Sequence, residues 1–183
     1  INSRESIWPL CSARKRSNQV KAAHAAAKDR VVSDAEKIRR SISHERTLVH
    51  ATPVELEFAG RLRKRKLDVT PQRAVHFYNL DVAVNVPTIA VEIFGGGFHA
   101  YGEHLATHFR RTKHLLDLGW SVLIIWIDAK RYPLSIACDD YVVKFVEELS
   151  LNPSKRGEYR VIRGDGNPAP IRHTYLNTPA DIK

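Results

Sequence analysis

The feature that most constrains the fold is a run of eight residues, 120–127, in which every residue except Ser121 is apolar. A strand that is buried on both faces has this continuous pattern, whereas a half-exposed strand alternates apolar and polar residues. Gly119 comes directly before the run, at a position where glycine commonly ends a helix. We therefore expect a helix at residues 102–118, followed by the central strand of a sheet that is covered on both faces.

The segments around this strand predict an α/β domain with a mixed sheet of about four strands and helices on both faces. Thr52-Pro53-Val54-Glu55 has the N-cap residue, the first-turn proline and the acidic third residue of a helix N-terminus. Val86-Pro87 divides two strand-like runs and predicts a hairpin. In chain order we expect a helix at 53–66, a connection at 68–75, strands at 76–85 and 88–94, the helix and central strand described above, a helix at 138–149 and a strand at 159–163.

The net charge of +9 lies at the two ends of the chain. Residues 1–50 carry 11 Lys or Arg and 5 Asp or Glu, residues 51–149 carry 12 of each, and the residues from Ser150 onward carry 6 and 3. We therefore divide the chain into a basic arm at 1–50, a folded domain at 51–150 and a basic extension at 151–183. Basic ends favour contacts with nucleic-acid phosphates. The alternative is that they only keep the chain soluble.

The arm differs from the domain in composition. Residues 18–32 are rich in alanine and predict a helix, and Ser33-Asp34-Ala35-Glu36 has the pattern of a capping box that begins a second helix through Ile42. Few large apolar residues are present, so the arm is expected to lie on the domain, on a partner chain or on DNA. The arm residues that we expect to contact double-stranded DNA are Arg14, Lys15, Arg16, Lys21, Lys28, Arg39 and Arg40.

Two classes of protein are disfavoured. Only Cys11 and Cys138 occur, which argues against a disulfide scaffold and fits an intracellular, reducing compartment. No apolar run approaches the ~18 residues that a membrane span needs, so we expect no membrane partner.

Two acidic residues interrupt the apolar strands of the predicted hairpin. If the hairpin is centred on Val86-Pro87, paired positions sum to 173, and Asp81 lies opposite Glu92. Their Cβ atoms would then be about 5 Å apart. Like charges this close need a cation between them, and one or two carboxylates commonly hold Mg²⁺. The alternatives are a solvated face, or a register that is shifted by one residue.

A third acid and two histidines are expected near this pair. Glu55 shares a helical stripe with Phe58 and Leu62 and therefore faces inward, although it can also cap its own helix. His99 follows the glycines at 95–97, which permit close backbone contact with a ligand. His108 lies on the inward stripe of its helix, where a hydrogen-bonded core position is an equal alternative.

Four motifs together resemble the very short patch repair endonuclease, a branch of the PD-(D/E)XK nucleases, and the related domains of phage and intron homing endonucleases. The resemblance covers about residues 50–130. The motifs are, in order, Thr52-x-x-Glu55, Asp81, Val91-Glu92-Ile93-Phe94-Gly95-x-x-Phe98-His99 and Gly119-Trp120-Ser121-Val122-Leu123-Ile124-Ile125-Trp126. The resemblance implies a restriction-endonuclease-like core with an extended helical N-terminal arm.

The resemblance also implies a role for each matched residue. Asp81 would be the main ligand of Mg²⁺ or Mn²⁺, with the backbone carbonyl of Ile93, and Glu55 would support it. Glu92 keeps an acid that the wider superfamily has and the repair enzyme lacks, and we expect it to hold the ion with Asp81. His99 would be the general base, and Phe98 would contact DNA. The chain departs from the family at Phe94, where the superfamily has a lysine, and at His108, where the repair enzyme has an aspartate that partners its histidine. One aromatic wedge position and the zinc-binding cysteines are also missing.

From the resemblance we expect a metal-dependent endodeoxyribonuclease that hydrolyses phosphodiester bonds, most similar in setting to a homing endonuclease. A homodimer is one option for its assembly, which the sequence leaves open. A mismatch-repair or restriction endonuclease is one alternative. A DNA-binding protein whose nuclease centre has decayed is another, because of Phe94 and His108.

Overall fold

The computed structural model describes residues 18–23, 25, 30–95 and 102–169, without the side chains of residues 102–105. The chain divides into two compact units, Ile1–Glu36 and Lys37–Lys183, of which the larger contains the sheet. The larger unit thus begins before residue 50, the boundary suggested by the charge pattern. In the smaller unit, residues 18–23 and 25 are helical.

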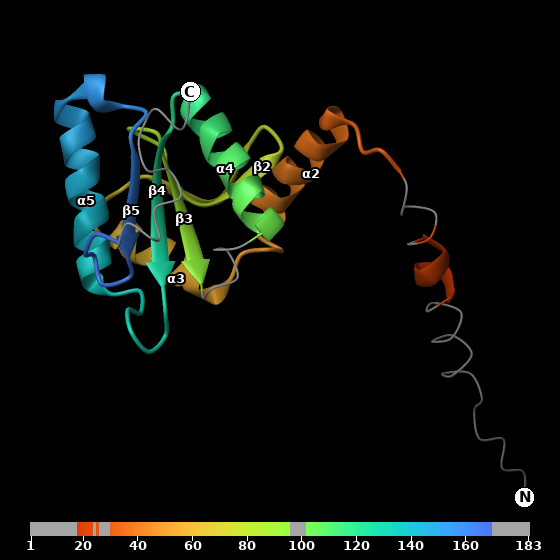
Figure 1. Cartoon of the computed structure of the whole chain (residues 1–183), viewed down its shortest axis with the longest axis horizontal. Helices are drawn as coiled ribbons and strands as arrows, with labels where there is room; N and C mark the ends of the chain where they lie inside the picture. The colour runs from red at the N-terminus through yellow and green to blue at the C-terminus, as the bar shows by residue number, and fades with distance from the viewer. Residues whose placement is uncertain (1–17, 24, 26–29, 96–101, 170–183) are drawn as a thin grey trace, which may run out of the picture. The chain divides into compact units, whose positions relative to one another are not determined.

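The larger unit is built on a five-stranded mixed sheet in the order β1-β2-β3-β4-β5 (Figure 1). Strands β1 (Val69–Val75), β2 (Tyr78–Val84) and β3 (Ile89–Gly95) pair antiparallel with one another in chain order. Strand β4 (Ser121–Ile127) is parallel to β3, and β5 (Tyr159–Arg163) is parallel to β4. The expected mixed α/β fold is confirmed, with one strand more than predicted.

Helices cover the two faces of the sheet and divide the core into two clusters. Helices α3 (Pro53–Lys64) and α5 (Ile136–Leu151) pack on the face formed by residues such as Val82, Val91 and Leu123. Helix α4 (Gly102–Asp117) covers the other face, where Leu115 packs near Ala90. The first six residues of β4 are all buried, which confirms the prediction of a central strand covered on both faces.

The segment at 68–75, which we expected to be a connection, forms strand β1. The prediction was wrong because Pro71 was taken as a break in regular structure. β1 is an edge strand with β2 as its one neighbour, and a proline is tolerated there since its missing N–H removes no bond of a central ladder. This strand carries Gln72, whose side-chain amide donates a hydrogen bond to Glu55.

Helix α2 (Asp34–Thr47) extends past Ile42, the predicted end, because its second half is tied to the β1–β2 hairpin. The Ser41 hydroxyl donates a hydrogen bond to the His76 carbonyl at 2.6 Å, and the Asn79 side-chain amide donates to the Ser41 carbonyl at 2.8 Å. The Glu45 carboxylate accepts from the Ala74 N–H at 2.7 Å. In the part of the chain that the structure describes, no helix is long and apolar enough to cross a membrane.

Candidate metal centre

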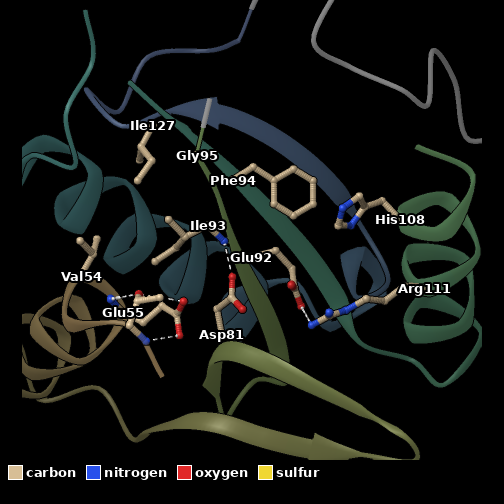
Figure 2. A pocket seen from close by; sticks show the side chains of 11 residues that line it. Val54, Glu55, Asp81, Glu92, Ile93, Phe94, Gly95, His108, Arg111 and Ile127 are labelled. Atoms are coloured by element: carbon tan, nitrogen blue, oxygen red, sulfur yellow. Dashed lines mark hydrogen bonds and ion pairs between the residues drawn. The ribbon is translucent and has the colours of Figure 1, made fainter. Parts of the chain in front are cut away.

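A cavity of about 440 Å³ opens where β2 and β3 separate, between the start of α3 and the middle of α4 (Figure 2). Its polar wall contains three carboxylates, those of Glu55, Asp81 and Glu92, and the guanidinium of Arg111. Phe94 and His108 form part of its apolar wall. The three acids that the sequence analysis identified therefore line one cavity.

The β2–β3 hairpin has the predicted register. Val82 pairs with Val91 and Val84 with Ile89, so the paired positions sum to 173 as expected. The pairing stops at Val82–Val91, one residue before Asp81 would pair with Glu92. Asp81 instead turns its carboxylate toward β3, and Oδ2 accepts a hydrogen bond from the Ile93 N–H at 2.7 Å. The two acids therefore face the same opening without forming a regular cross-strand pair.

The end of the pairing also affects the Ile93 carbonyl. In a strand, the N–H and C=O of one residue point to the same side. The Ile93 N–H points toward Asp81, so its carbonyl oxygen also faces the gap between β2 and β3. A carboxylate and a backbone carbonyl therefore border the same gap, as the proposed ligand roles of Asp81 and Ile93 require.

Gln72 of β1 lies opposite Asp81 of β2, at an irregular position of the sheet. The β1–β2 register places Gln72 opposite Asp81, but these two residues do not pair, whereas Pro71–Val82 and Arg73–Leu80 on either side of them do. Gln72 has a positive φ of 51°, which is uncommon for a residue with a side chain. Its buried side-chain amide donates to Glu55 Oε2 at 2.8 Å. The irregular backbone of β1 thus turns an amide donor toward the third acid.

Glu55 is held by its own helix as well as by Gln72. The Thr52 hydroxyl oxygen accepts from the Glu55 N–H, and Glu55 Oε2 accepts from the Thr52 N–H, so the predicted capping box is present. Glu55 is 8% exposed and lies on the buried stripe with Phe58 and Leu62. The prediction that this acid faces inward is confirmed.

Glu92 forms a buried ion pair with Arg111 of α4. Glu92 is 4% exposed, and the Arg111 Nη2 donates to its Oε1 at 2.7 Å. The same Nη2 donates to the Asn79 carbonyl, and the guanidinium lies over the Tyr78 ring with its carbon 5.5 Å from the ring centre. The positive charge next to Glu92 is therefore a guanidinium, a partner that the sequence analysis did not identify.

Burial and repulsion by neighbouring carboxylates raise the pKa values of both strand acids. Loss of hydration raises the pKa of Glu92 to about 8 and that of Asp81 to about 6, although Arg111 opposes both shifts. The charge of Glu55 raises both pKa values further. In this structure the acids are therefore more readily protonated than ordinary carboxyl groups.

Phe94 and His108 form the aromatic side of the cavity. Phe94 is 4% exposed, and its ring lies 4.4 Å from the His108 ring and 5.5 Å from the Trp126 ring, centre to centre. Phe94 is thus a packed core residue. His108 borders the cavity as predicted.

Several predicted residues are not tested by this geometry. His99, Phe98, Arg14, Lys15, Arg16 and Lys28 lie outside the described residues. Lys21, Arg39 and Arg40 are exposed, as residues that contact DNA must be.

The oxygen donors at the cavity suit a hard divalent cation. Asp81 uses Oδ2 for its bond to Ile93, and Glu92 uses Oε1 for its bond to Arg111, so the second oxygen of each carboxylate takes no part in these two bonds. Carboxylate and carbonyl oxygens are the ligands that Mg²⁺ prefers. Among the described residues, however, no three His, Cys, Asp or Glu side chains are grouped closely enough to hold a metal ion. Two carboxylates with a backbone carbonyl and water match the way Mg²⁺ is usually bound.

Two residues of the site were missed at the sequence level. Arg111 is three residues after His108 and four before Leu115, so helical spacing alone places it beside the inward stripe. Gln72 lies in the segment that was interpreted as a connection, and no sequence signal indicated its positive φ.

Comparisons of the chain with protein-family models, with curated proteins and with solved structures found no match.

Proposed function

We propose that this protein is a metal-dependent DNA endonuclease that hydrolyses phosphodiester bonds with Mg²⁺ or Mn²⁺, and that its core belongs to the restriction-endonuclease-like type. The observation that supports this most is the junction of Asp81, Ile93 and Glu92 where the β2–β3 pairing ends. It combines two strand carboxylates with a backbone carbonyl at the edge of an open cavity. The four motifs described above support the same function.

The charge of the cavity supports a divalent cation. Three ionised carboxylates and one guanidinium give a formal charge of −3 + 1 = −2. Protonation could remove this charge, and the raised pKa values of Asp81 and Glu92 favour it. A divalent cation would cancel the same charge and keep the carboxylates ionised at neutral pH.

In this mechanism Asp81 and Glu92 would hold the cation with the Ile93 carbonyl. When bound, the metal would polarise a phosphoryl oxygen and lower the pKa of a coordinated water. Asp81 is fixed by its bond to the Ile93 N–H, and Glu55 by its bonds to Gln72 and Thr52, so neither acid needs to reorient greatly. His99 would take the proton of the attacking water.

Double-stranded DNA is the proposed substrate because basic residues gather outside the neutral body of the chain. A homing endonuclease is the proposed setting, since such nucleases join a cleavage domain to a separate DNA-binding segment. Mismatch repair has less support because one aromatic wedge position and the zinc-binding cysteines of the repair enzyme are missing.

A plasmid-cleavage assay with purified protein tests the proposed function. We expect conversion of supercoiled plasmid to nicked or linear DNA in Mg²⁺ or Mn²⁺, and none in excess chelator. Intact plasmid in both metals, across a range of sequences and temperatures, would contradict it.

The Glu92–Arg111 ion pair favours a second candidate, a DNA-binding protein that has lost cleavage. A guanidinium already balances the charge of Glu92, and Phe94 supplies no cation. Calorimetry separates the two candidates, because a decayed centre would bind DNA but show no Mg²⁺ or Mn²⁺ binding that depends on Asp81.

A further inference from the structure

We propose that Arg111 is the phosphate-binding residue of this site: its guanidinium, paired with Glu92 in this structure, contacts a nonbridging oxygen of the target phosphodiester when Glu92 binds a divalent cation. This inference rests on the proposed nuclease function and assigns a role that neither the motifs nor the metal ligands supply.

Arg111 has the right charge in the right place. Of the described residues that line the cavity, it alone carries a permanent positive charge. Its side chain is only 20% exposed. Burial lowers the pKa of its guanidinium, but the charges of Glu92 and Asp81 outweigh this effect and raise it. A phosphate that approaches the acidic cavity would therefore meet one fixed cation, which offsets its repulsion by the carboxylates.

The guanidinium also has a donor to spare. Arginine offers five N–H donors, and here Nη2 supplies both the bond to Glu92 and the bond to Asn79. The Nε atom is buried and has no hydrogen-bond partner in this structure. A buried unpaired donor is costly to a fold, so it calls for an explanation. A phosphate, which accepts two parallel N–H bonds from a guanidinium, would supply partners.

The partner exchange follows from charge. While an ionised Glu92 carboxylate faces Arg111, the two charges balance. A divalent cation bound to Glu92 would balance the charge of this carboxylate in place of Arg111. The guanidinium next to the cavity would then have no counter-ion. An uncompensated buried charge is costly, and the phosphate of the substrate would restore the balance. Phe94, on the same face of β3 as Glu92, is buried against Trp126, so β3 offers no competing cation at that position.

The neighbouring Arg110 provides a matched control. It lies on the same helix and carries the same charge, but it is exposed and its side chain donates to Thr107 on its own helix. Replacing Arg110 removes one positive charge from α4 without touching the cavity. Any effect of the net charge on DNA binding should therefore be equal for the two arginines.

The test compares the full-length wild type with Arg111→Gln, Arg111→Lys, Arg110→Gln and Asp81→Asn. Gln keeps an N–H donor for Glu92 and Asn79 but removes the charge, and Lys restores the charge without the planar fork. Calorimetry measures Mg²⁺ affinity in the absence of DNA, and single-turnover assays measure cleavage of a short duplex.

We expect Arg111→Gln to bind Mg²⁺ at least as tightly as the wild type, because a competing cation is gone, and to cleave at least ~100-fold more slowly. Arg111→Lys should recover ~10-fold of that loss, and Arg110→Gln should cleave like the wild type. Two results would overturn the inference: cleavage by Arg111→Gln within threefold of Arg110→Gln, or a loss of Mg²⁺ affinity that accounts for its slower cleavage. The second result would make Arg111 a positioning residue for Glu92.

Failure of the proposed function gives a different pattern. In that case the wild type does not cleave, and Asp81→Asn binds Mg²⁺ as the wild type does, so both proposals fall together. If Arg111→Gln does not fold, Arg111→Lys decides: a KM for DNA raised by ~10-fold at unchanged Mg²⁺ affinity supports phosphate binding, and an unchanged KM and kcat contradict it.

Discussion

The Asp81 carboxylate takes the place of a backbone carbonyl in the pairing of β2 with β3: its Oδ2 accepts the Ile93 N–H at 2.7 Å. If the register of Val82–Val91 continued, Leu80 would lie opposite Ile93 and its carbonyl would accept that N–H. Leu80 instead pairs only with Arg73 of β1, so β2 leaves β3 at Asp81. A side chain held by the backbone in this way has its orientation set before any ligand binds.

Asp81→Asn should abolish cleavage while DNA binding stays near the wild-type level. The amide oxygen of Asn can still accept the Ile93 N–H, so the fold is kept, but the negative charge that would hold the cation is lost. We expect a fall of at least ~100-fold in the cleavage rate. Glu57→Gln is the control, since Glu57 is an exposed acid on the outer face of α3. Cleavage by folded Asp81→Asn at the wild-type rate would remove the proposed centre.

Stability in chelator should fall as the pH rises from about 5 to about 8. Burial raises the pKa of Glu92 from 4.5 to about 8, so between these values the folded protein holds a proton that the unfolded chain has released. Stability from this group is full below its unfolded pKa and is lost as the pH rises through its folded pKa. Denaturant titrations across this range measure the effect, which we expect to be about 2 kcal/mol.

Glu92→Gln should flatten that pH dependence, because a neutral amide has no proton to lose, and Glu57→Gln should leave it unchanged. Added Mg²⁺ should stabilise the wild type most at pH 8, where protons no longer neutralise the acids. Equal slopes for the wild type and Glu92→Gln would show that another group is responsible.

Removal of residues 1–36 should make DNA binding less dependent on salt. This segment is the smaller compact unit and carries seven Lys or Arg residues, so the sheet stays intact while phosphate contacts are lost. Each lost contact should reduce the slope of log K against log salt by ~0.9, and we expect a total reduction of ~2 to 4. Fluorescence titrations of both proteins across salt concentrations measure the slopes. Identical slopes would mean that the segment does not contact DNA.

Phe94→Lys should destabilise the protein without speeding cleavage. The Phe94 ring is packed between His108 and Trp126, and losing such a ring from a core typically costs about 3 kcal/mol or more. Phe94→Leu is the control, because it keeps an apolar side chain and should lose less. Denaturant unfolding and the plasmid assay measure the two effects. A stable, faster Phe94→Lys enzyme would show that the position still accepts a catalytic lysine.

The parts of the fold with a strong local signal were predicted from the sequence. The apolar run of β4 predicted a central strand, the Thr52–Glu55 capping box placed α3, and the Val86-Pro87 turn gave the hairpin register. Each depends on residues near one another in the chain. The register in turn brought Asp81 and Glu92 to one opening.

The missing parts depend on contacts between distant segments. Strand β1 was not predicted because Pro71 breaks the pattern of a central strand but not that of an edge strand. The bond from the Gln72 amide to Glu55 comes with a positive φ at Gln72, which has no sequence signature in a residue other than glycine or asparagine. The partner of Glu92 came from α4, 19 residues away, and a cation was expected there in the form of a metal.

The last prediction concerns His99 and His108. Gly95 ends β3 at the cavity, and His99 follows it by four residues in the sequence. His108 borders the cavity with its ring against Phe94. If His99 takes the proton of the attacking water, cleavage should rise with pH through the range where histidine ordinarily loses its proton, about 6.5.

His99→Ala should lose at least ~100-fold in rate and this pH dependence. His108→Asp should stay active, since an aspartate beside a histidine base stabilises its protonated form. His50→Ala, at an exposed position, is the control for the loss of one imidazole. Cleavage by His99→Ala at the wild-type rate and with the wild-type pH profile would show that water is activated without His99, even where Asp81→Asn is inactive.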